Sequence, residues 1–157
     1  MKAAVVYASY HKKNTERIAQ LFARSWNADA YPILRIASLP NAAEYEILAI
    51  GSGIYKWSYH PKILKWIDTL PEGHGKPVVL FSTSSFQNEK FNDPVQKTLE
   101  SKGYEILGRF HSKGSSSFLP SWLLGGMTKD RPNDADMERA QHFADTMNER
   151  IRLLKEE

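Results

Sequence analysis

Residues 7–19 read YASYHKKNTERIA, and this stretch decides the fold because it joins a buried strand to an amphipathic helix. The preceding run Lys2–Tyr7 (KAAVVY) is short and apolar, as expected of a strand buried on both faces of a parallel sheet. Asn14 is a good N-cap, and the apolar side chains that follow it fall on one helical face: Ile18, Phe22 and Trp26. The polar loop between them is either an anion site at a helix N-terminus or an ordinary turn with two lysines.

The same alternation of strand and helix patterns continues along the chain. Further strands are expected at Tyr31–Ile36, Tyr45–Ile50, Pro77–Phe81 and Tyr104–Phe110, the first of them near a sheet edge because Pro32 cannot donate to a ladder. Pro61 and Pro94 suit the first turns of two helices, and Gly103 suits the end of the second. A last helix follows a cap at Asn133 or Asp134 and keeps its apolar spacing to Leu154.

Strands that alternate with helices predict an α/β fold, a parallel sheet covered by helices on both faces. Residues 1–157 are expected to form a single domain, since this length suffices to bury one core. Only residues 112–133 lack a convincing period, and irregular segments of that length in a compact domain are usually functional or disordered.

Composition excludes several classes of function. The chain has no cysteine, which excludes disulfides, thiolate metal sites and cysteine nucleophiles. The net charge of +3 is too small, and the aromatic residues too separate from the basic ones, to indicate nucleic-acid binding. The short apolar run at the start has no cleavage pattern after it, and no apolar stretch is long enough for a membrane span. A cytoplasmic location is therefore expected.

Three loops leave the carboxyl ends of predicted strands, where open parallel sheets bind their ligands. Ser9–Thr15 offers hydroxyls, backbone donors and the positive end of a helix dipole, so it can hold an anion without a metal. Ser52–Tyr59, with Gly51 just before it, offers two glycines for close backbone approach of a ligand and three aromatic rings, and Ser82–Asn88 adds four hydroxyls. A phosphate site beside flat apolar faces suits a phosphorylated planar ligand.

The motifs SYHKKNT, AIGSGIY, FSTSS and GGMTKDRPNDADMERAQHFA together resemble the flavodoxin family, and the resemblance runs from Ala3 to about residue 147. The closest likeness is to small flavodoxin-like proteins with an S-Y-H-x-x-N-T first loop. The resemblance implies a doubly wound sandwich with a five-stranded sheet of order 2-1-3-4-5. It also implies non-covalently bound FMN as cofactor, and a redox partner protein or a small-molecule electron acceptor.

The resemblance assigns the residues of the three loops to parts of FMN. It places the phosphate in the first loop, at Ser9, Tyr10, His11, Lys13, Asn14 and Thr15. It places the isoalloxazine ring between the second and third loops, whose assigned residues are Ser52, Gly53, Ile54, Tyr55 and Trp57 on one side and Thr83, Ser84 and Ser85 on the other. We expect Trp26 and Trp66 to lie in the core instead, since both follow helical apolar spacing.

Two residues depart from the family pattern. Lys13 stands where a glycine usually precedes the Asn-Thr pair, and Ser85 stands where the third loop usually ends in glycine. If the first position needs a positive φ, lysine costs on the order of 1 kcal/mol there.

Other activities fit the sequence poorly. The five histidines lack the spacing of a metal site, and GSGIY is not the G-x-S-x-G elbow of a hydrolase. A two-component receiver needs acidic residues where Ser9 and Gly51-Ser52 stand. Three readings stay open: an electron carrier, an NAD(P)H-dependent reductase of quinones or similar small acceptors that uses the same FMN site, and a flavin-free relative.

Overall fold

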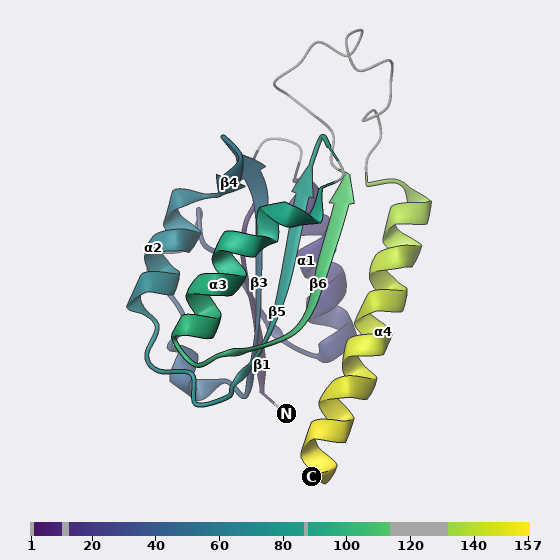
Figure 1. The fold of residues 1–157 in the computed structure, drawn as a ribbon. Helices are drawn as coiled ribbons and strands as arrows, with labels where there is room; N and C mark the ends of the chain where they lie inside the picture. Colours follow the sequence, from purple (N-terminus) through teal and green to yellow (C-terminus); the bar gives the residue numbers. More distant parts are fainter. Residues whose placement is uncertain (1, 11–12, 87, 114–131) are drawn as a thin grey trace, which may run out of the picture.

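A computed structural model of the protein describes residues 2–10, 13–86, 88–113 and 132–157, and it shows helices packed on both sides of a twisted sheet (Figure 1). The strands β1 (Ala3–Ala8), β2 (Asp29–Pro32), β3 (Ile47–Tyr55), β5 (Pro77–Ser84) and β6 (Glu105–Lys113) are parallel, in the order β2-β1-β3-β5-β6. A short strand β4 (Ser58–Tyr59) pairs antiparallel with the end of β3. The predicted α/β class and strand order are confirmed.

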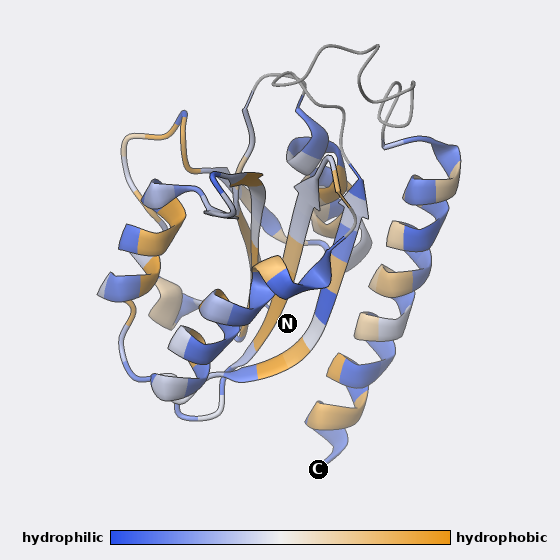
Figure 2. Ribbon diagram, turned by 45° about the horizontal axis from the view of Figure 1, so that its top comes forward, coloured by the Kyte–Doolittle hydropathy of each residue, from blue (hydrophilic) through white to orange (hydrophobic). Residues whose placement is uncertain are grey.

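The strands β1, β3, β5 and β6 contribute side chains to two cores because successive residues point to opposite faces of the sheet. Ala4, Val6 and Ala8 of β1 belong to the core beneath α2 (Pro61–Thr69) and α3 (Asp93–Ser101). Ala3, Val5 and Tyr7 belong to the core beneath α1 (Asn14–Trp26) and α4 (Asp134–Glu156). Figure 2 shows the apolar stripes of the helices turned toward the sheet.

The aromatic side chains of this second core confirm part of the sequence reading. Phe22 stacks on Trp26 with ring centroids 4.8 Å apart and meets Phe81 edge-on at 5.2 Å. Trp26 and, in the other core, Trp66 are buried, as their helical spacing predicted. Within the described ranges, no helix has both the length and the apolar character needed to cross a bilayer.

The strand boundaries differ from the predicted ones in two ways. The strand expected at Tyr31–Ile36 is Asp29–Pro32: it ends where Pro32 pairs with Tyr7, after which Arg35 N donates to Pro32 O in a turn. The strands β3, β5 and β6 instead run past their apolar windows, since polar residues at their carboxyl ends still pair with neighbouring strands. Of the irregular segment 112–133, residues 114–131, Trp122 among them, lie outside the described part of the chain.

The helix ends also correct one prediction and confirm another. Asn14 is the first residue of α1, and the N-cap is Lys13, which makes no side-chain capping bond. Asn133 caps α4 in a reciprocal capping box with Asp136, each side chain accepting from the other's backbone N at 2.9 Å.

Candidate functional site

The three predicted loops meet at the carboxyl edge of the sheet. Their strands β1, β3 and β5 are neighbours, with Ser52 in register between Ala8 and Ser82. Thr15, from the first turn of α1, and Thr83, from β5, are both buried, and their hydroxyl oxygens lie 2.8 Å apart. From β1 the chain passes to β2 on one side and later to β3 on the other, so this edge is the point where strand order reverses.

The first loop enters α1 through a left-handed residue. Lys13 has φ 57° and ψ 32°, which aims the N-terminus of the helix at the edge of the sheet. Ser9 Oγ accepts from Glu16 N at 3.1 Å, so its own hydroxyl hydrogen is left to donate elsewhere. Tyr10 is exposed and Asn14 half-buried, while the predicted His11 and the neighbouring Lys12 lie outside the described residues.

A buried carboxylate beneath this loop was not predicted. Glu16 Oε1 accepts from the Tyr7 hydroxyl at 3.2 Å and from the Arg35 guanidinium, and Lys13 Nζ lies 3.8 Å from Oε2. Burial and the nearby Glu16 charge raise the pKa of Tyr7 above its ordinary value. Arg35 and Lys13 together balance the charge of Glu16, which also lies in the first turn of a helix, where a negative charge is stabilised.

The left-handed conformation of Lys13 gives a stability prediction. A non-glycine residue pays roughly 1 kcal/mol for this conformation, so Lys13→Gly should raise the free energy of unfolding by up to about that amount. Urea unfolding measures the change. Lys13→Ala is the matched control, because it removes the same ammonium but keeps a Cβ; equal gains from both variants would assign the effect to charge.

The second loop is a tight hairpin between β3 and β4 with two strained residues at its tip. Lys56 and Trp57 have φ of 48° and 68°, which two-residue hairpins normally give to asparagine and glycine. Each costs on the order of 1 kcal/mol in this conformation. Trp57 at the tip of the hairpin is 74% exposed, and its ring contacts Phe91 with ring centroids 6.0 Å apart.

Gly53 in this loop and Gly51 just before it accommodate aromatic rings of the chain itself. A Cβ on Gly51 would lie 2.1 Å from the Phe81 ring, and one on Gly53 would lie 3.0 Å from the Tyr55 hydroxyl. The Tyr55 ring also meets the Tyr10 ring edge-on, with centroids 6.4 Å apart, and this contact joins the first loop to the second. Burial raises the pKa of Tyr55 to about 12. The sequence suggested glycines for close approach of a ligand, and the structure gives them this packing role.

Two further predicted residues of the second loop point inward. Ser52 is fully buried, accepting from His60 N at 2.9 Å and donating to Gly53 O at 2.6 Å, so it ties the end of β3 to the start of α2. Ile54 is half-buried and packs against the core beneath α2. Ser52 and Ile54 therefore fix the second loop through contacts with the protein interior.

In the third loop, Ser84 and a buried histidine that was not predicted hold the turn together. His111 Nδ1 lies 2.7 Å from Ser82 Oγ, and Nε2 lies 3.0 Å from Ser84 Oγ and 3.1 Å from Phe86 O. A carbonyl only accepts, so we place the imidazole hydrogen on Nε2, which leaves Nδ1 to accept from Ser82. The remaining predicted residue, Ser85, is half-buried in the bend that follows.

His111 makes the stability of this loop depend on pH. Burial lowers the pKa of His111. The hydrogen bond to Phe86 O and the negative charge of Glu89 partly oppose this shift, and the positive charge of Arg139 adds to it. Between the lowered folded pKa and the unfolded value near 6.5, the unfolded chain binds more protons. The free energy of unfolding should therefore fall as pH drops below about 6.5.

Urea unfolding of the wild type and of His111→Gln, in steps from neutral to mildly acidic pH, measures this dependence. The variant should show a flatter profile, whereas His142→Gln, a change at an exposed histidine of α4, should follow the wild type. Part of the pH dependence that remains in His111→Gln comes from His60. Burial and the nearby charge of Lys62 lower the pKa of His60 as well. A profile unchanged by His111→Gln would contradict the assignment.

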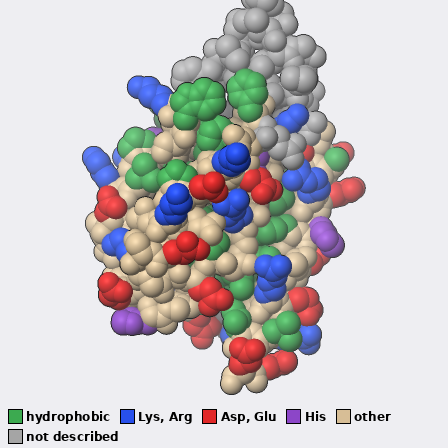
Figure 3. All heavy atoms as spheres, in the orientation of Figure 1, with side chains coloured by type: hydrophobic (Ala, Val, Ile, Leu, Met, Phe, Trp, Pro, Cys, Tyr) green, Lys and Arg blue, Asp and Glu red, His purple; other side chains and the backbone are tan. Residues whose placement is uncertain are grey.

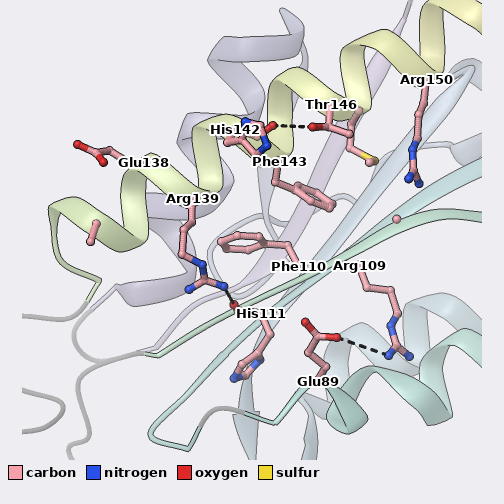
Figure 4. Close-up of a pocket in the computed structure, with 13 residues that line it drawn as sticks. Glu89, Arg109, Phe110, His111, Glu138, Arg139, His142, Phe143, Thr146 and Arg150 are labelled. Carbon is pink, nitrogen blue, oxygen red and sulfur yellow. Dashed lines mark hydrogen bonds and ion pairs between the residues drawn. The ribbon is translucent and has the colours of Figure 1, made fainter.

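A separate cavity of about 780 Å³ lies between β6 and α4, and His111, which contacts the third loop, is one of its lining residues (Figure 4). Its arginines are engaged by the protein: Arg139 donates to His111 O at 3.2 Å, Arg150 donates to Leu107 O at 2.7 Å, and Arg109 pairs with Asp93. Arg139 and Arg150 thus cover carbonyl groups along the free edge of β6. Among the described residues, no cluster of three or more histidine or acidic side chains could hold a metal ion.

Comparison with known proteins identifies one relative by sequence. No family model matches the chain. The uncharacterized protein MJ0298 of Methanocaldococcus jannaschii is 40% identical over 147 residues, which cover 92% of this chain and 96% of the relative. That identity over nearly the full length of both chains places them in one family.

Solved structures share the fold at much lower identity. A flavodoxin from the domain Archaea is 16% identical with a TM-score of 0.71, covering 97% of this chain and 99% of its own. Oxidised flavodoxin 1 of Bacillus cereus is 17% identical with a TM-score of 0.72, covering 95% and 98%. The rubredoxin oxygen:oxidoreductase of Desulfovibrio gigas is 14% identical with a TM-score of 0.72. The match covers 97% of this chain but only 36% of the oxidoreductase chain. These likenesses establish a flavodoxin-like fold.

Proposed function

The chain belongs to one family with MJ0298 and has a flavodoxin-like fold, and from this premise we propose that it binds FMN non-covalently and transfers electrons through the flavin. The observation that carries the proposal is the convergence of the three loops where strand order reverses, joined by the Thr15–Thr83 hydrogen bond and the Tyr10–Tyr55 contact.

In this proposal the first loop holds the phosphate. The first turn of α1 would face a dianion with the positive end of the helix dipole, and the Ser9 and Thr15 hydroxyls would add hydrogen bonds to it. The nearby carboxylate, Glu16, is neutralised by Arg35 and bound by Tyr7 below the loop, so it does not oppose the phosphate. The residues present therefore fit a phosphate group.

The second and third loops would hold the isoalloxazine ring. Tyr55 and Trp57 supply flat apolar faces, and Thr83 and Ser84 supply hydroxyls at the end of the neighbouring strand. When bound, the flavin supplies the redox chemistry; the protein supplies binding, orientation and the local field. His111, by holding Ser84 and Phe86 O, would fix the shape of the third loop beside the ring.

The visible absorption spectrum of the purified protein tests this proposal. We expect flavin bands after incubation with FMN and gel filtration, with one FMN released per chain on denaturation. A protein fraction that is colourless after incubation with excess FMN and gel filtration would contradict the proposal and favour a flavin-free relative. Steady-state oxidation of NADH and NADPH with quinones then separates a carrier, which shows no turnover, from a reductase.

A further inference from the structure

A buried histidine, His111, holds the third loop closed. It lies on the edge strand β6, is 2% exposed and stands in register with Ser82 of β5. Its Nε2 lies 3.0 Å from Ser84 Oγ and 3.1 Å from Phe86 O, and the Ser84 hydroxyl also donates to Phe86 O. The Phe86 ring is 52% exposed, so packing of that ring does not fix the turn. The turn from Ser84 to Phe86 therefore depends on the imidazole.

The contact with Ser82 makes this arrangement sensitive to protonation. In the neutral ring, Nδ1 accepts the hydroxyl hydrogen of Ser82 at an N–O distance of 2.7 Å, and Ser82 is fully buried. A second ring hydrogen, on Nδ1, would reverse this bond and leave the hydroxyl hydrogen of Ser82 without its acceptor. The imidazolium would also place a charge where water is excluded, which is costly. If the turn between Ser84 and Phe86 opens, water reaches Nε2 and this second cost falls.

The cavity between β6 and α4 brings solvent close to this histidine. His111 is one of its lining residues, and Figure 4 shows Arg139 of α4 reaching the backbone of His111. The cavity has a volume of about 780 Å³, many times that of a water molecule. A proton can therefore reach His111 along the edge of the sheet without separation of its strands.

Charged side chains from two other elements act on the imidazole. Glu89, in the short helix before α3, favours the protonated ring, whereas Arg139 of α4 opposes it. Arg139 donates to His111 O at 3.2 Å and also lies 3.8 Å from the buried Asp136. The strand β5 has no charged residue. Two charges of opposite sign, from different elements, therefore influence whether His111 takes up a proton.

The wider surface around the ring has no single sign of charge. Arg109, two residues before His111 on β6, pairs with Asp93. Glu138 and His142 of α4 line the same cavity and are exposed. Figure 3 shows acidic and basic side chains intermixed over α3 and the adjoining part of β6. The protonation of His111 is therefore set by its nearest neighbours and not by the net charge of this face.

We propose that protonation of His111 opens the turn between Ser84 and Phe86 and thereby weakens flavin binding, so that the protein releases its ligand as the pH falls. The inference rests on the proposed function, because that function places the isoalloxazine ring against Thr83 and Ser84. A ring in this place would hold the turn closed and keep water from Nε2, which disfavours the imidazolium. Release of the ligand is then accompanied by uptake of at most one proton at His111.

Fluorescence titration of the protein with riboflavin at a series of pH values tests the proposal. Riboflavin is the better probe because it lacks the phosphate, whose own second pKa near about 6 would obscure the result. Its Kd should rise at least ~3-fold between about pH 7.5 and about pH 5, and by at most ~10-fold per pH unit, the limit for one proton. Circular dichroism at each pH confines the measurement to folded protein. A Kd that does not change with pH would overturn the proposal.

Two variants of the neighbouring charges should shift this response in opposite directions. Arg139→Gln removes the charge that opposes the imidazolium but keeps a donor for His111 O, so the rise in Kd should begin at a higher pH. Glu89→Gln removes the charge that favours the imidazolium, so the rise should begin at a lower pH. The two midpoints should differ by at least ~0.5 pH unit. Shifts in the same direction, or no shift in either variant, would contradict the assignment to His111.

Two histidine variants separate His111 from a second histidine near the site. His111→Gln keeps an N–H for Phe86 O but takes up no proton, so its Kd should vary less than ~2-fold over the same pH range. His60 accepts from Lys62 N at 3.1 Å and meets Tyr55 edge-on, so its protonation would act on the second loop. His60→Asn keeps a capping side chain without that titration and should retain the wild-type response. A response lost in His60→Asn but kept in His111→Gln would overturn the proposal.

Where only FMN binds tightly enough to measure, a ratio of dissociation constants replaces the riboflavin titration. The phosphate titrates alike in the wild type and in His111→Gln, so the ratio of their Kd values for FMN cancels its contribution. This ratio should rise at least ~3-fold over the same pH range. A ratio that stays constant would overturn the proposal.

Nuclear magnetic resonance of the flavin-free protein keeps this test separate from that of flavin binding. At neutral pH the spectrum of nitrogen-labelled histidine should show the hydrogen of His111 on Nε2. On acidification, the backbone amides of Ser84 and Phe86 should shift with the same midpoint as the His111 ring. If no flavin binds but these signals move together, the response of the loop stands and the proposed function fails. If flavin binds and its affinity ignores pH, or the ring titrates while the turn stays in place, this inference alone fails.

Discussion

FMN is expected to bind at least ~100-fold more tightly than riboflavin, a difference of about 2.7 kcal/mol. The two ligands differ only in the phosphate, which the first loop would hold with the N-terminus of α1 and the Ser9 and Thr15 hydroxyls. A hydrogen bond to a charged group contributes about 1.5–3 kcal/mol, and a helix N-terminus adds about 0.3–1 kcal/mol for an anion. Two such contributions reach the expected difference. Isothermal titration with both ligands measures it, and equal affinities would contradict the phosphate assignment.

Two threonine variants show which part of the ligand each loop holds. Thr15→Ala should weaken FMN binding by about 1–2 kcal/mol and leave riboflavin binding almost unchanged. Thr83→Ala removes the other partner of the same 2.8 Å hydrogen bond but lies on the ring side, so it should weaken both ligands alike. The pair is matched, since each variant breaks one shared contact. The same response to both variants would mean that the lost contact, and not the phosphate, explains the effect.

The fold could be predicted from sequence because its information is local. Short continuous apolar runs and apolar residues at helical spacing identify strands and helices without any knowledge of their neighbours, and their alternation leaves few topologies. The boundaries were predicted less well. β3 continues to Tyr55 and β5 to Ser84 because polar residues there complete the ladder with neighbouring strands. An apolar window ends before such residues.

The candidate site was predicted only as a set of loops. Strand ends and turn-forming residues indicate where loops lie, and adjacency of β1, β3 and β5 brings them together. The pairs Glu16–Arg35 and Ser84–His111 join residues 19 and 27 positions apart, and no local pattern marks either of them. His111 is buried at the end of an edge strand, but no feature of the sequence around it distinguishes a buried histidine from an exposed one. The glycine pattern suggested a positive φ at Lys13, and the structure confirms it.

Replacement of Gly51 by alanine is expected to destabilise the protein by about 3 kcal/mol, the upper part of the usual range for overpacking a core. The added Cβ would lie 2.1 Å from two ring carbons of Phe81, its register partner on β5. Phe81 cannot move aside, because it is fully buried and meets Phe22 edge-on. Urea unfolding followed by circular dichroism measures the loss.

A glycine elsewhere and a smaller neighbour separate overpacking from other causes. Gly75→Ala adds a Cβ with nothing within 4 Å and is opposed only by a φ of 79°, so it should cost about 1 kcal/mol. Phe81→Leu leaves room above Gly51, and the double variant should be less destabilised than the sum of the two single variants by at least about 1 kcal/mol. Strict additivity would show that the ring is not what excludes a side chain at position 51. Because Gly51 directly precedes Ser52 and Gly53, an overpacked floor would also displace the second loop, so Gly51→Ala should weaken FMN and riboflavin equally.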